Sequence, residues 1–185
     1  MFPSHDPTLF LSGAFQSVIK IYGHYDLLVN NAGIGSTPDY EHLLRINLSA
    51  VIEGTLSAMS HMRKDKGGRG GLIVNIASTT GLAPAPFAPV YAASKHGVVG
   101  FSRSFGPAVE PLGVKVLCLC PSFANTEIHL GRLKYVEKWE TIDRIMEVSE
   151  VASAFAKLVD EEVNGSVLGV YHDGAEYQFR RKARL

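Results

Sequence analysis

Tyr91 and Lys95, in the run YAASKHG, have a spacing that suits proton transfer. Residues four apart share one face of a helix, so the ammonium of Lys95 can lie beside the phenol of Tyr91 and favour its ionised form. A phenolate near neutral pH is a usable base. Ser78 ends the apolar run LIVNIAS, thirteen residues before Tyr91. Together these three residue types can remove a proton from an alcohol.

The elements that must position this trio follow from the distribution of apolar residues. Short apolar runs rich in β-branched residues alternate with longer segments of helical period, which is typical of strands and crossover helices in a parallel sheet. We therefore expect an α/β fold. A single domain over residues 1–185 is predicted, because a chain of this length with 46% apolar residues can bury one core.

Four strands and four helices are expected. The strands are predicted at Leu27 to Asn30, Leu72 to Ala77, Val114 to Cys120 and Val167 to Tyr171. The helices are predicted at about Leu9 to Tyr22, Tyr40 to Arg63, Pro89 to Leu112 and Val148 to Val159. The middle two strands are continuously apolar, which indicates burial on both faces of the sheet. Gly106 and Pro107 interrupt the third helix, so a kink or break is predicted there.

Composition and charge argue against several classes of function. Lys plus Arg and Asp plus Glu number 18 each, so no overall field attracts nucleic acid or an anionic membrane. The opening MFPSHDPTLFL lacks a basic segment and carries Asp6, which is typical of neither a signal peptide nor a membrane-spanning helix. A soluble cytoplasmic protein is therefore expected.

Metal and phosphate sites have little support in the sequence. Cys118 and Cys120 alternate along one predicted strand, so they are interpreted as small buried thiols and not as a disulfide or a metal pair. The seven histidines show no ligand spacing, so no metal site is predicted. The run KGGRGG precedes a strand, whereas a phosphate-binding loop follows a strand and opens a helix. Residues 66–71 are therefore interpreted as a flexible turn.

Several separated motifs resemble the short-chain dehydrogenase/reductase family in their order and spacing. They are the run NNAG, Asn47 in a predicted helix, Ser78 after a strand and the pair Tyr91-x-x-x-Lys95. The longer runs VYAASKHGVVGFSRS, LIVNIASTTGLAP and CPSFANTEI look most like 15-hydroxyprostaglandin dehydrogenase and its insect relatives among the alcohol dehydrogenases. The resemblance spans about Phe15 to Tyr171 and implies a Rossmann-like, doubly wound parallel sheet.

This resemblance implies NAD(P)-dependent interconversion of a secondary alcohol and its ketone. Tyr91 would be the acid/base residue, and Lys95 would lower the pKa of Tyr91 and hold the nicotinamide ribose. Ser78 would donate a hydrogen bond to the substrate oxygen, and Asn47 would hold a water that links Lys95 to solvent. Ser122 stands where the family usually has Gly, which alters the backbone approach to the ring. The implied cofactor-binding positions are Asn31, Ala32, Gly33, Tyr91, Lys95 and the stretch from Pro121 to Thr126.

Each of these positions also has a structural alternative. A helical tyrosine is usually a core or interface anchor, a lone lysine is a solvated charge, and Ser78 fits a turn or cap because TTG follows it. A structural hydrogen bond would satisfy the buried amide of Asn47 as well as a water would. Asn30 and Asn31 are equally well explained as strand-end residues bonded to neighbouring backbone. The combined spacing of serine, tyrosine and lysine favours the active-site interpretation.

A complete fold of this family begins with a strand, a glycine-rich turn and a helix that receives the pyrophosphate. No such turn stands in the first thirty residues, so the chain is expected to be truncated and to lack the adenine-binding half. The strand at Leu27 to Asn30 would then form an exposed, apolar edge of a four-stranded sheet. A second hypothesis follows, that of a non-catalytic protein that pairs with full-length homologues through its long helices or this open edge.

The expected substrate is a lipid-like alcohol or ketone. Apolar residues between Pro84 and Val90, together with the segment Glu127 to Trp139, would form an apolar entrance to the site for this substrate. The residue that selects NAD or NADP normally follows a strand that this chain lacks, so both cofactors stay open and the resemblance favours NAD. By analogy with the family, a homo-oligomer through the two long helices is expected.

Overall fold

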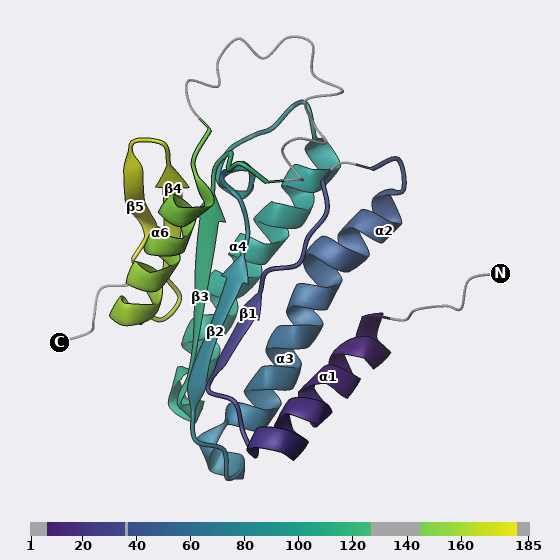
Figure 1. The fold of residues 1–185 in the computed structure, drawn as a ribbon, viewed down its shortest axis with the longest axis vertical. Coiled ribbons are helices and arrows are strands. Elements are labelled where there is room, and N and C mark those ends of the chain that lie inside the picture. The colour runs from purple at the N-terminus through teal and green to yellow at the C-terminus, as the bar shows by residue number, and fades with distance from the viewer. Residues whose placement is uncertain (1–6, 36, 127–144, 181–185) are drawn as a thin grey trace.

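The computed structural model describes residues 7–35, 37–126 and 145–180, and these form one sheet with helices on both faces (Figure 1). Within the described residues the sheet has five strands in the order β1-β2-β3-β4-β5. Strands β1 to β4 are parallel, and β5 runs antiparallel to β4. The strands are β1 (Leu27–Asn30), β2 (Gly71–Ile76), β3 (Val114–Pro121), β4 (Val167–Tyr171) and β5 (Gly174–Phe179). The expected α/β class is confirmed, and the four predicted strands lie within one residue of their predicted bounds.

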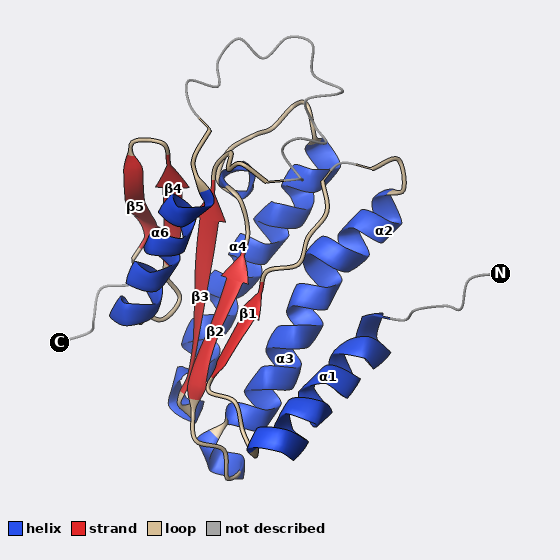
Figure 2. Cartoon of the chain, viewed as in Figure 1, coloured by secondary structure: helices blue, strands red, loops and turns tan. Residues whose placement is uncertain are grey.

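Helices cover the two faces of the sheet, as a doubly wound fold requires (Figure 2). Val74 and Leu117 point to one face and pack with Leu158 of α6, whereas Ile73 and Val116 pack on the other face with α3. Helix α4 covers the same face as α3, and α1 lies against α3. The helices are α1 (Pro7–Tyr22), α2 (Tyr40–Leu44), α3 (Ala50–Met62), α4 (Pro89–Val109) and α6 (Val148–Glu161), and a π-helical turn, Arg45–Ser49, joins α2 to α3.

The prediction of a four-stranded sheet is wrong, because β5 adds a fifth, antiparallel strand. The chain turns back after Tyr171, with Gly174 at a φ of +142°, and β5 then pairs with β4. Strand β5 carries the sequence GAEYQF, in which polar residues alternate with apolar ones and most side chains are partly or fully exposed. Its sequence therefore lacks the continuous apolar character by which the other strands were identified.

The predicted break in the third long helix is also wrong, since α4 continues through Gly106 and Pro107 to Val109. Pro107 lies close to the end of the helix, so the loss of one backbone donor interrupts few further helical bonds. Asn164 also braces this turn, because its amide nitrogen donates to the carbonyl of Gly106 at 2.9 Å. A Cβ at position 106 would lie 2.7 Å from Oδ1 of Asn164, so the contact requires glycine. The helix ends in a 3-10 turn, Glu110–Leu112.

Asn164→Ala is expected to lower the free energy of unfolding by about 1 to 3 kcal/mol. Asn164 is 7% exposed, and its Oδ1 accepts from the backbone N–H of Val116 at 2.8 Å. The substitution leaves that N–H, in the middle of β3, without its partner. Urea unfolding measures the change. Asn31→Ala, at an exposed asparagine, serves as the control and should alter stability by less than about 0.5 kcal/mol. Equal losses in the two variants would contradict this account of Asn164.

Strand β1 lies at the edge of the sheet, as predicted. Leu27 is 42% exposed and Val29 is 37% exposed, although both align with buried residues of β2, Leu72 and Val74. The edge is therefore an apolar surface, which agrees with the expectation from the sequence. Among the described helices, none is long and apolar enough to cross a membrane.

Candidate active site

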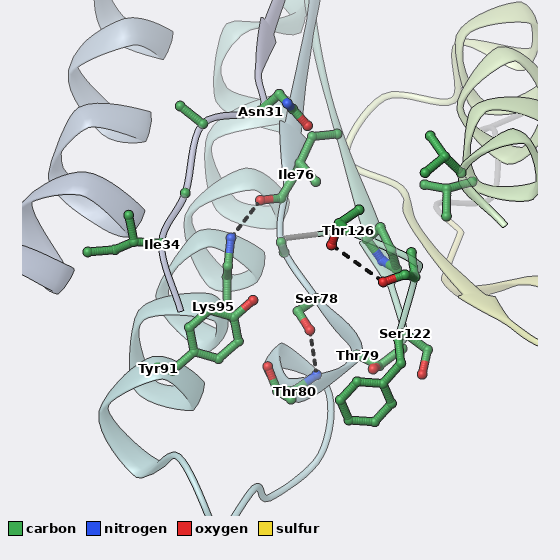
Figure 3. Close-up of a pocket in the computed structure, with 18 residues that line it drawn as sticks. Asn31, Ile34, Ile76, Ser78, Thr79, Thr80, Tyr91, Lys95, Ser122 and Thr126 are labelled. Atoms are coloured by element: carbon green, nitrogen blue, oxygen red, sulfur yellow. Dashed lines mark hydrogen bonds between the residues drawn. The ribbon is translucent and has the colours of Figure 1, made fainter. Parts of the chain in front are cut away.

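A pocket of about 570 Å³ opens at the carboxyl ends of β1, β2 and β3. This is the edge at which doubly wound sheets bind ligands. The pocket brings together Ser78, Tyr91 and Lys95, which come from two separate elements (Figure 3). Its remaining lining residues are Asn31, Ala32, Gly33, Ile34, Ile76, Ala77, Thr79, Thr80, Pro121, Ser122, Phe123, Ala124, Thr126, Val148 and Val151.

Helix α4 carries Tyr91 and Lys95 on one face, as the four-residue spacing predicts. The helix begins at Pro89, whose missing N–H is no loss in the first turn. The Lys95 Nζ lies 5.7 Å from the centroid of the Tyr91 ring, so a cation at this position lies beside the phenol. Figure 3 shows the two side chains next to each other, both directed toward the pocket.

The Lys95 amine is buried at the base of the pocket. The residue is 4% exposed, and Nζ donates to the carbonyl oxygen of Ile76 at 3.1 Å. Burial lowers the pKa of Lys95 to about 8, because the charged form loses hydration. The solvated-charge alternative for Lys95 is therefore wrong. An amine with this pKa changes protonation state close to physiological pH.

Ser78 follows the end of β2, where it caps a turn and also lines the pocket. Its Oγ accepts a hydrogen bond from the backbone N–H of Thr80 at 3.2 Å, which caps the short 3-10 turn Thr79–Gly81. Ser78 also lines the pocket opposite Tyr91 (Figure 3). Because Oγ accepts in the cap, its own proton can still be donated to a ligand.

Gly81 holds the Ser78 turn against α4. A Cβ at position 81 would lie 2.6 Å from the backbone oxygen of Lys95, closer than real Cβ atoms come to such an atom. The glycine therefore permits the backbone contact that sets the separation between the segment carrying Ser78 and the helix carrying Tyr91 and Lys95.

Gly81→Ala is expected to lower the free energy of unfolding by about 1 to 3 kcal/mol, because the added methyl group forces backbone apart. Thermal or urea unfolding checks this. Gly100→Ala is the matched control, since Gly100 is an exposed position of α4 with no atom within 4 Å of an added Cβ. It should raise stability by about 0.5 to 1 kcal/mol. The same sign for both substitutions would contradict the close-contact explanation.

Asn47 is fully buried and does not line the pocket. The π-helical turn carries it toward the loop after β1, where its amide bonds both backbone groups of Ile34. Oδ1 accepts from the Ile34 N–H at 2.8 Å, and Nδ2 donates to the Ile34 carbonyl at 2.9 Å. A structural hydrogen bond therefore satisfies this amide, and the loop of Gly33 and Ile34 is fixed by it.

The two asparagines that follow one another at the end of β1 have different surroundings. Asn30 points into the core, where its Nδ2 donates to Asn75 at 2.8 Å and to Thr55 at 3.1 Å. Asn75 in turn donates to Ser102 on α4 at 2.9 Å. This buried network joins β1, β2, α3 and α4 beneath the pocket, whereas Asn31 lines the pocket itself. Asn30 therefore has structural partners, but they lie at least 21 residues away in the chain and are not the neighbouring backbone that the alternative expected.

Part of the pocket wall was not predicted from the sequence. Val148 and Val151 belong to α6 and lie at the pocket, whereas Phe123, which also lines it, falls within the predicted stretch from Pro121 to Thr126. The only sequence signal for the two valines is that they open an amphipathic helix. No residue between Pro84 and Val90 lines the pocket, so the predicted contribution of that stretch to an apolar entrance is wrong. The segment Glu127 to Trp139 lies outside the described residues.

The described residues contain no group of three or more His, Cys, Asp or Glu side chains placed to hold a metal ion. The chemistry available at this pocket is therefore that of a hydroxyl, a phenol and a buried amine beside an open space. Such a set can orient an alcohol oxygen and exchange a proton with it.

The sheet order, the helices on both faces and the position of the pocket define an α/β protein of the Rossmann-like class. Within that class, the model of the short-chain dehydrogenases matches residues 10–134, and the chain belongs to this family. Rat 15-hydroxyprostaglandin dehydrogenase [NAD(+)] is 40% identical over 149 residues, with 80% of this chain and 54% of the rat protein covered. The human enzyme of that name is 36% identical over 179 residues, with 86% and 66% covered. The chain thus spans roughly half to two thirds of the length of these relatives.

An insect relative and two solved structures extend the comparison. Alcohol dehydrogenase 1 of Ceratitis capitata is 50% identical over 117 residues, with 62% of this chain and 46% of the insect protein covered. The structure of levodione reductase matches with a TM-score of 0.77 and 22% identity, covering 88% of this chain and 71% of that one. A 3-ketoacyl-(acyl-carrier-protein) reductase from Brucella melitensis, complexed with NADH, matches with a TM-score of 0.77 and 24% identity, covering 88% and 72%. At these identities the two structures establish the shared fold.

Proposed function

We propose that the chain is a nicotinamide-dependent oxidoreductase that interconverts a secondary alcohol and its ketone. The observation that carries this proposal is the meeting of Ser78, Tyr91 and Lys95 in one pocket at the carboxyl ends of three parallel strands. Membership of the short-chain dehydrogenase family and the dehydrogenase names of its relatives support the same reaction type.

In the proposed reaction Tyr91 takes the hydroxyl proton of the alcohol as the carbonyl forms, and returns it in the reverse direction. Lys95, as a cation beside the ring, favours the phenolate. Ser78 donates its hydroxyl proton to the substrate oxygen, which stabilises negative charge as that oxygen changes from alcohol to carbonyl. Asn47 fixes the adjoining loop in this proposal, and a water held near it would connect Lys95 to solvent.

The pocket fits the nicotinamide end of a dinucleotide. Gly33 leaves space that a side chain would fill, since a Cβ there would lie 3.3 Å from Asn47 and 3.6 Å from Lys95. The proposed cofactor-binding residues are Asn31, Ala32, Gly33, Tyr91, Lys95, Pro121 and Thr126. When bound, the nicotinamide ring accepts the hydride that leaves the carbinol carbon. NAD is the proposed cofactor, because the rat and human relatives carry NAD(+) in their names, and NADP is the comparison to be made.

A lipid-like secondary alcohol of the prostaglandin type is the proposed substrate. Phe123, Val148 and Val151 offer apolar surface at the pocket, and Val148 is 55% exposed there. Such surface suits a hydrocarbon chain attached to the reacting carbon.

The proposal extends to the oligomeric state and the cellular location of the protein. A homo-oligomer through the long helices is proposed, because Leu56 of α3 and Val90 of α4 are 42% and 38% exposed. A cytoplasmic location is proposed because both described cysteines, Cys118 and Cys120, are free thiols.

Titration of the purified chain with NAD and with NADP tests this function. We expect saturable binding of NAD that raises the midpoint of thermal unfolding, followed by oxidation of a lipid alcohol in the presence of that cofactor. Absence of binding by either cofactor at millimolar concentration would overturn the proposal and favour the non-catalytic alternative.

A further inference from the structure

Two buried serines lie on helix α4, and only one of them bonds to a residue that lines the pocket. Ser94 and Ser102 are both 0% exposed. The hydroxyl of Ser94 donates to the carbonyl of Tyr91 at 2.7 Å, and that of Ser102 donates to the carbonyl of Val98 at 2.8 Å. Each hydroxyl thus bonds back into the preceding turn of the helix. Only the turn before Ser94 carries a residue of the proposed active site.

The Ser94 hydroxyl also meets the amide that holds the loop after β1. Nδ2 of Asn47 donates to Ser94 Oγ at 3.5 Å, at the long end of the hydrogen-bond range. The same amide bonds both backbone groups of Ile34, which lines the pocket. Ser94 therefore stands between two parts of the pocket wall, the loop at Ile34 and the turn of α4 at Tyr91.

The π-helical turn that carries Asn47 lies directly against α4. A Cβ at Gly97 would lie 2.9 Å from the side chain of Leu48, so the glycine permits the close approach of the two elements. Asn47 precedes Leu48 in the chain, and Ser94 lies three residues before Gly97, on the same face of the helix. The contact between Asn47 and Ser94 is therefore part of a tight junction between two helical elements.

We propose that Ser94 is a positioning residue, which fixes the turn that carries Tyr91 against the loop after β1. This inference rests on the proposed function insofar as it concerns turnover. Ser94 is buried and does not line the pocket, so it acts through Tyr91 and does not touch the substrate. The Tyr91 side chain faces Ser78 across the pocket (Figure 3). A shift of the Tyr91 turn would change the separation of these two groups, and small misplacements of reacting groups slow a reaction strongly.

Amide hydrogen exchange at Ile34, followed by NMR, tests the junction independently of any catalytic activity. The N–H of Ile34 donates to Oδ1 of Asn47 at 2.8 Å, so its protection reports how firmly that amide is held. Ser94→Ala removes the hydroxyl that Asn47 meets and should accelerate exchange at Ile34 by about fivefold. Ser102→Ala is the matched control, because Ser102 is equally buried on α4 but accepts from Asn75, at 2.9 Å. It should leave exchange at Ile34 within about twofold of wild type.

Steady-state kinetics of the same variants tests the consequence for the reaction. We expect Ser94→Ala to lower kcat by about tenfold with KM little changed, because the base is displaced while the surface that binds the substrate is kept. Ser102→Ala should leave kcat within about twofold of wild type, although it also loses a buried hydroxyl and should lower the midpoint of thermal unfolding at least as far. Ser94→Cys, whose thiol is a weak donor of similar size, should recover part of kcat and covers the case in which the alanine variant does not fold.

Equal effects of Ser94→Ala and Ser102→Ala, on exchange at Ile34 or on kcat, would overturn the inference, because both would then reflect a general loss of stability. A Ser94→Ala variant with the wild-type kcat would overturn it as well. If the wild-type chain shows no turnover, the proposed function fails, whereas the exchange measurement still decides whether Ser94 holds the junction.

Discussion

Tyr91→Phe is expected to lower kcat for alcohol oxidation by about 10²- to 10⁴-fold, the range that general base catalysis contributes. The substitution removes the phenolic oxygen and keeps the ring that lies 5.7 Å from the Lys95 amine. Apart from the Lys95 amine, which donates to the Ile76 carbonyl, the described side chains of the pocket offer no other ordinary general base, since the remaining hydroxyls are those of serines and threonines. Steady-state rates with a panel of secondary alcohols check the result.

The affinity for NAD should stay within about threefold of wild type in this variant, because the ring by which Tyr91 would contact the cofactor is kept and only the oxygen that acts in the transition state is removed. Tyr177→Phe is the matched control. The Tyr177 hydroxyl donates to Glu161 at 2.9 Å, on β5 and away from the pocket, so its loss should leave kcat unchanged. A Tyr91→Phe variant that retains most of the wild-type kcat would contradict the assignment of Tyr91 as the base.

Lys95→Met is expected to remove a pH dependence of stability worth about 3 kcal/mol. In the folded chain burial lowers the pKa of Lys95 from 10.5 to about 8. The unfolded chain therefore binds the proton more tightly, and holding the charged amine in the core costs free energy that is fully present below about pH 8. That cost fades as the pH rises from about 8 to 10.5, so the wild-type chain should gain stability over this interval relative to Lys95→Met.

Urea unfolding of both proteins at about pH 7 and about pH 10.5 measures this difference, because other titrating groups contribute alike to both. Lys115→Met is the control. Lys115 pairs with Glu162 at 2.6 Å with 44% of its side chain exposed, and a surface pair of this kind is worth less than about 1 kcal/mol. The structure indicates that the Lys95 amine is desolvated. If the stability difference between the wild-type chain and Lys95→Met is the same at both pH values, that indication is contradicted.

The elements that carry the site could be predicted from local patterns. Strands β2 and β3 are continuous apolar runs, and α4 begins at a proline in the first helical turn, so the positions of Ser78, Tyr91 and Lys95 on these elements followed from the sequence. The burial of Lys95 did not follow, since a lysine alone on a helix resembles a solvated charge. Its burial depends on the Ile76 carbonyl, which lies nineteen residues away in the chain.

The features that could not be predicted depend on contacts between distant segments. Strand β5 has an alternating, half-exposed pattern that becomes a strand only because the edge of β4 is available to pair with it. The Gly106 carbonyl beside Pro107 in α4 accepts from Asn164, which lies far along the chain. The amide of Asn47 bonds to the Ile34 backbone, which a sequence pattern could not distinguish from a water-holding role.

Transfer of deuterium from a labelled alcohol to the cofactor is the most direct test of the central claim. The purified chain would be incubated with NAD and a secondary alcohol that carries deuterium on its carbinol carbon, and the cofactor would be examined by mass spectrometry. The account predicts reduced cofactor that carries the deuterium, together with the corresponding ketone. A cofactor that stays oxidised, or is reduced without deuterium, under conditions in which NAD binding is saturated would contradict it.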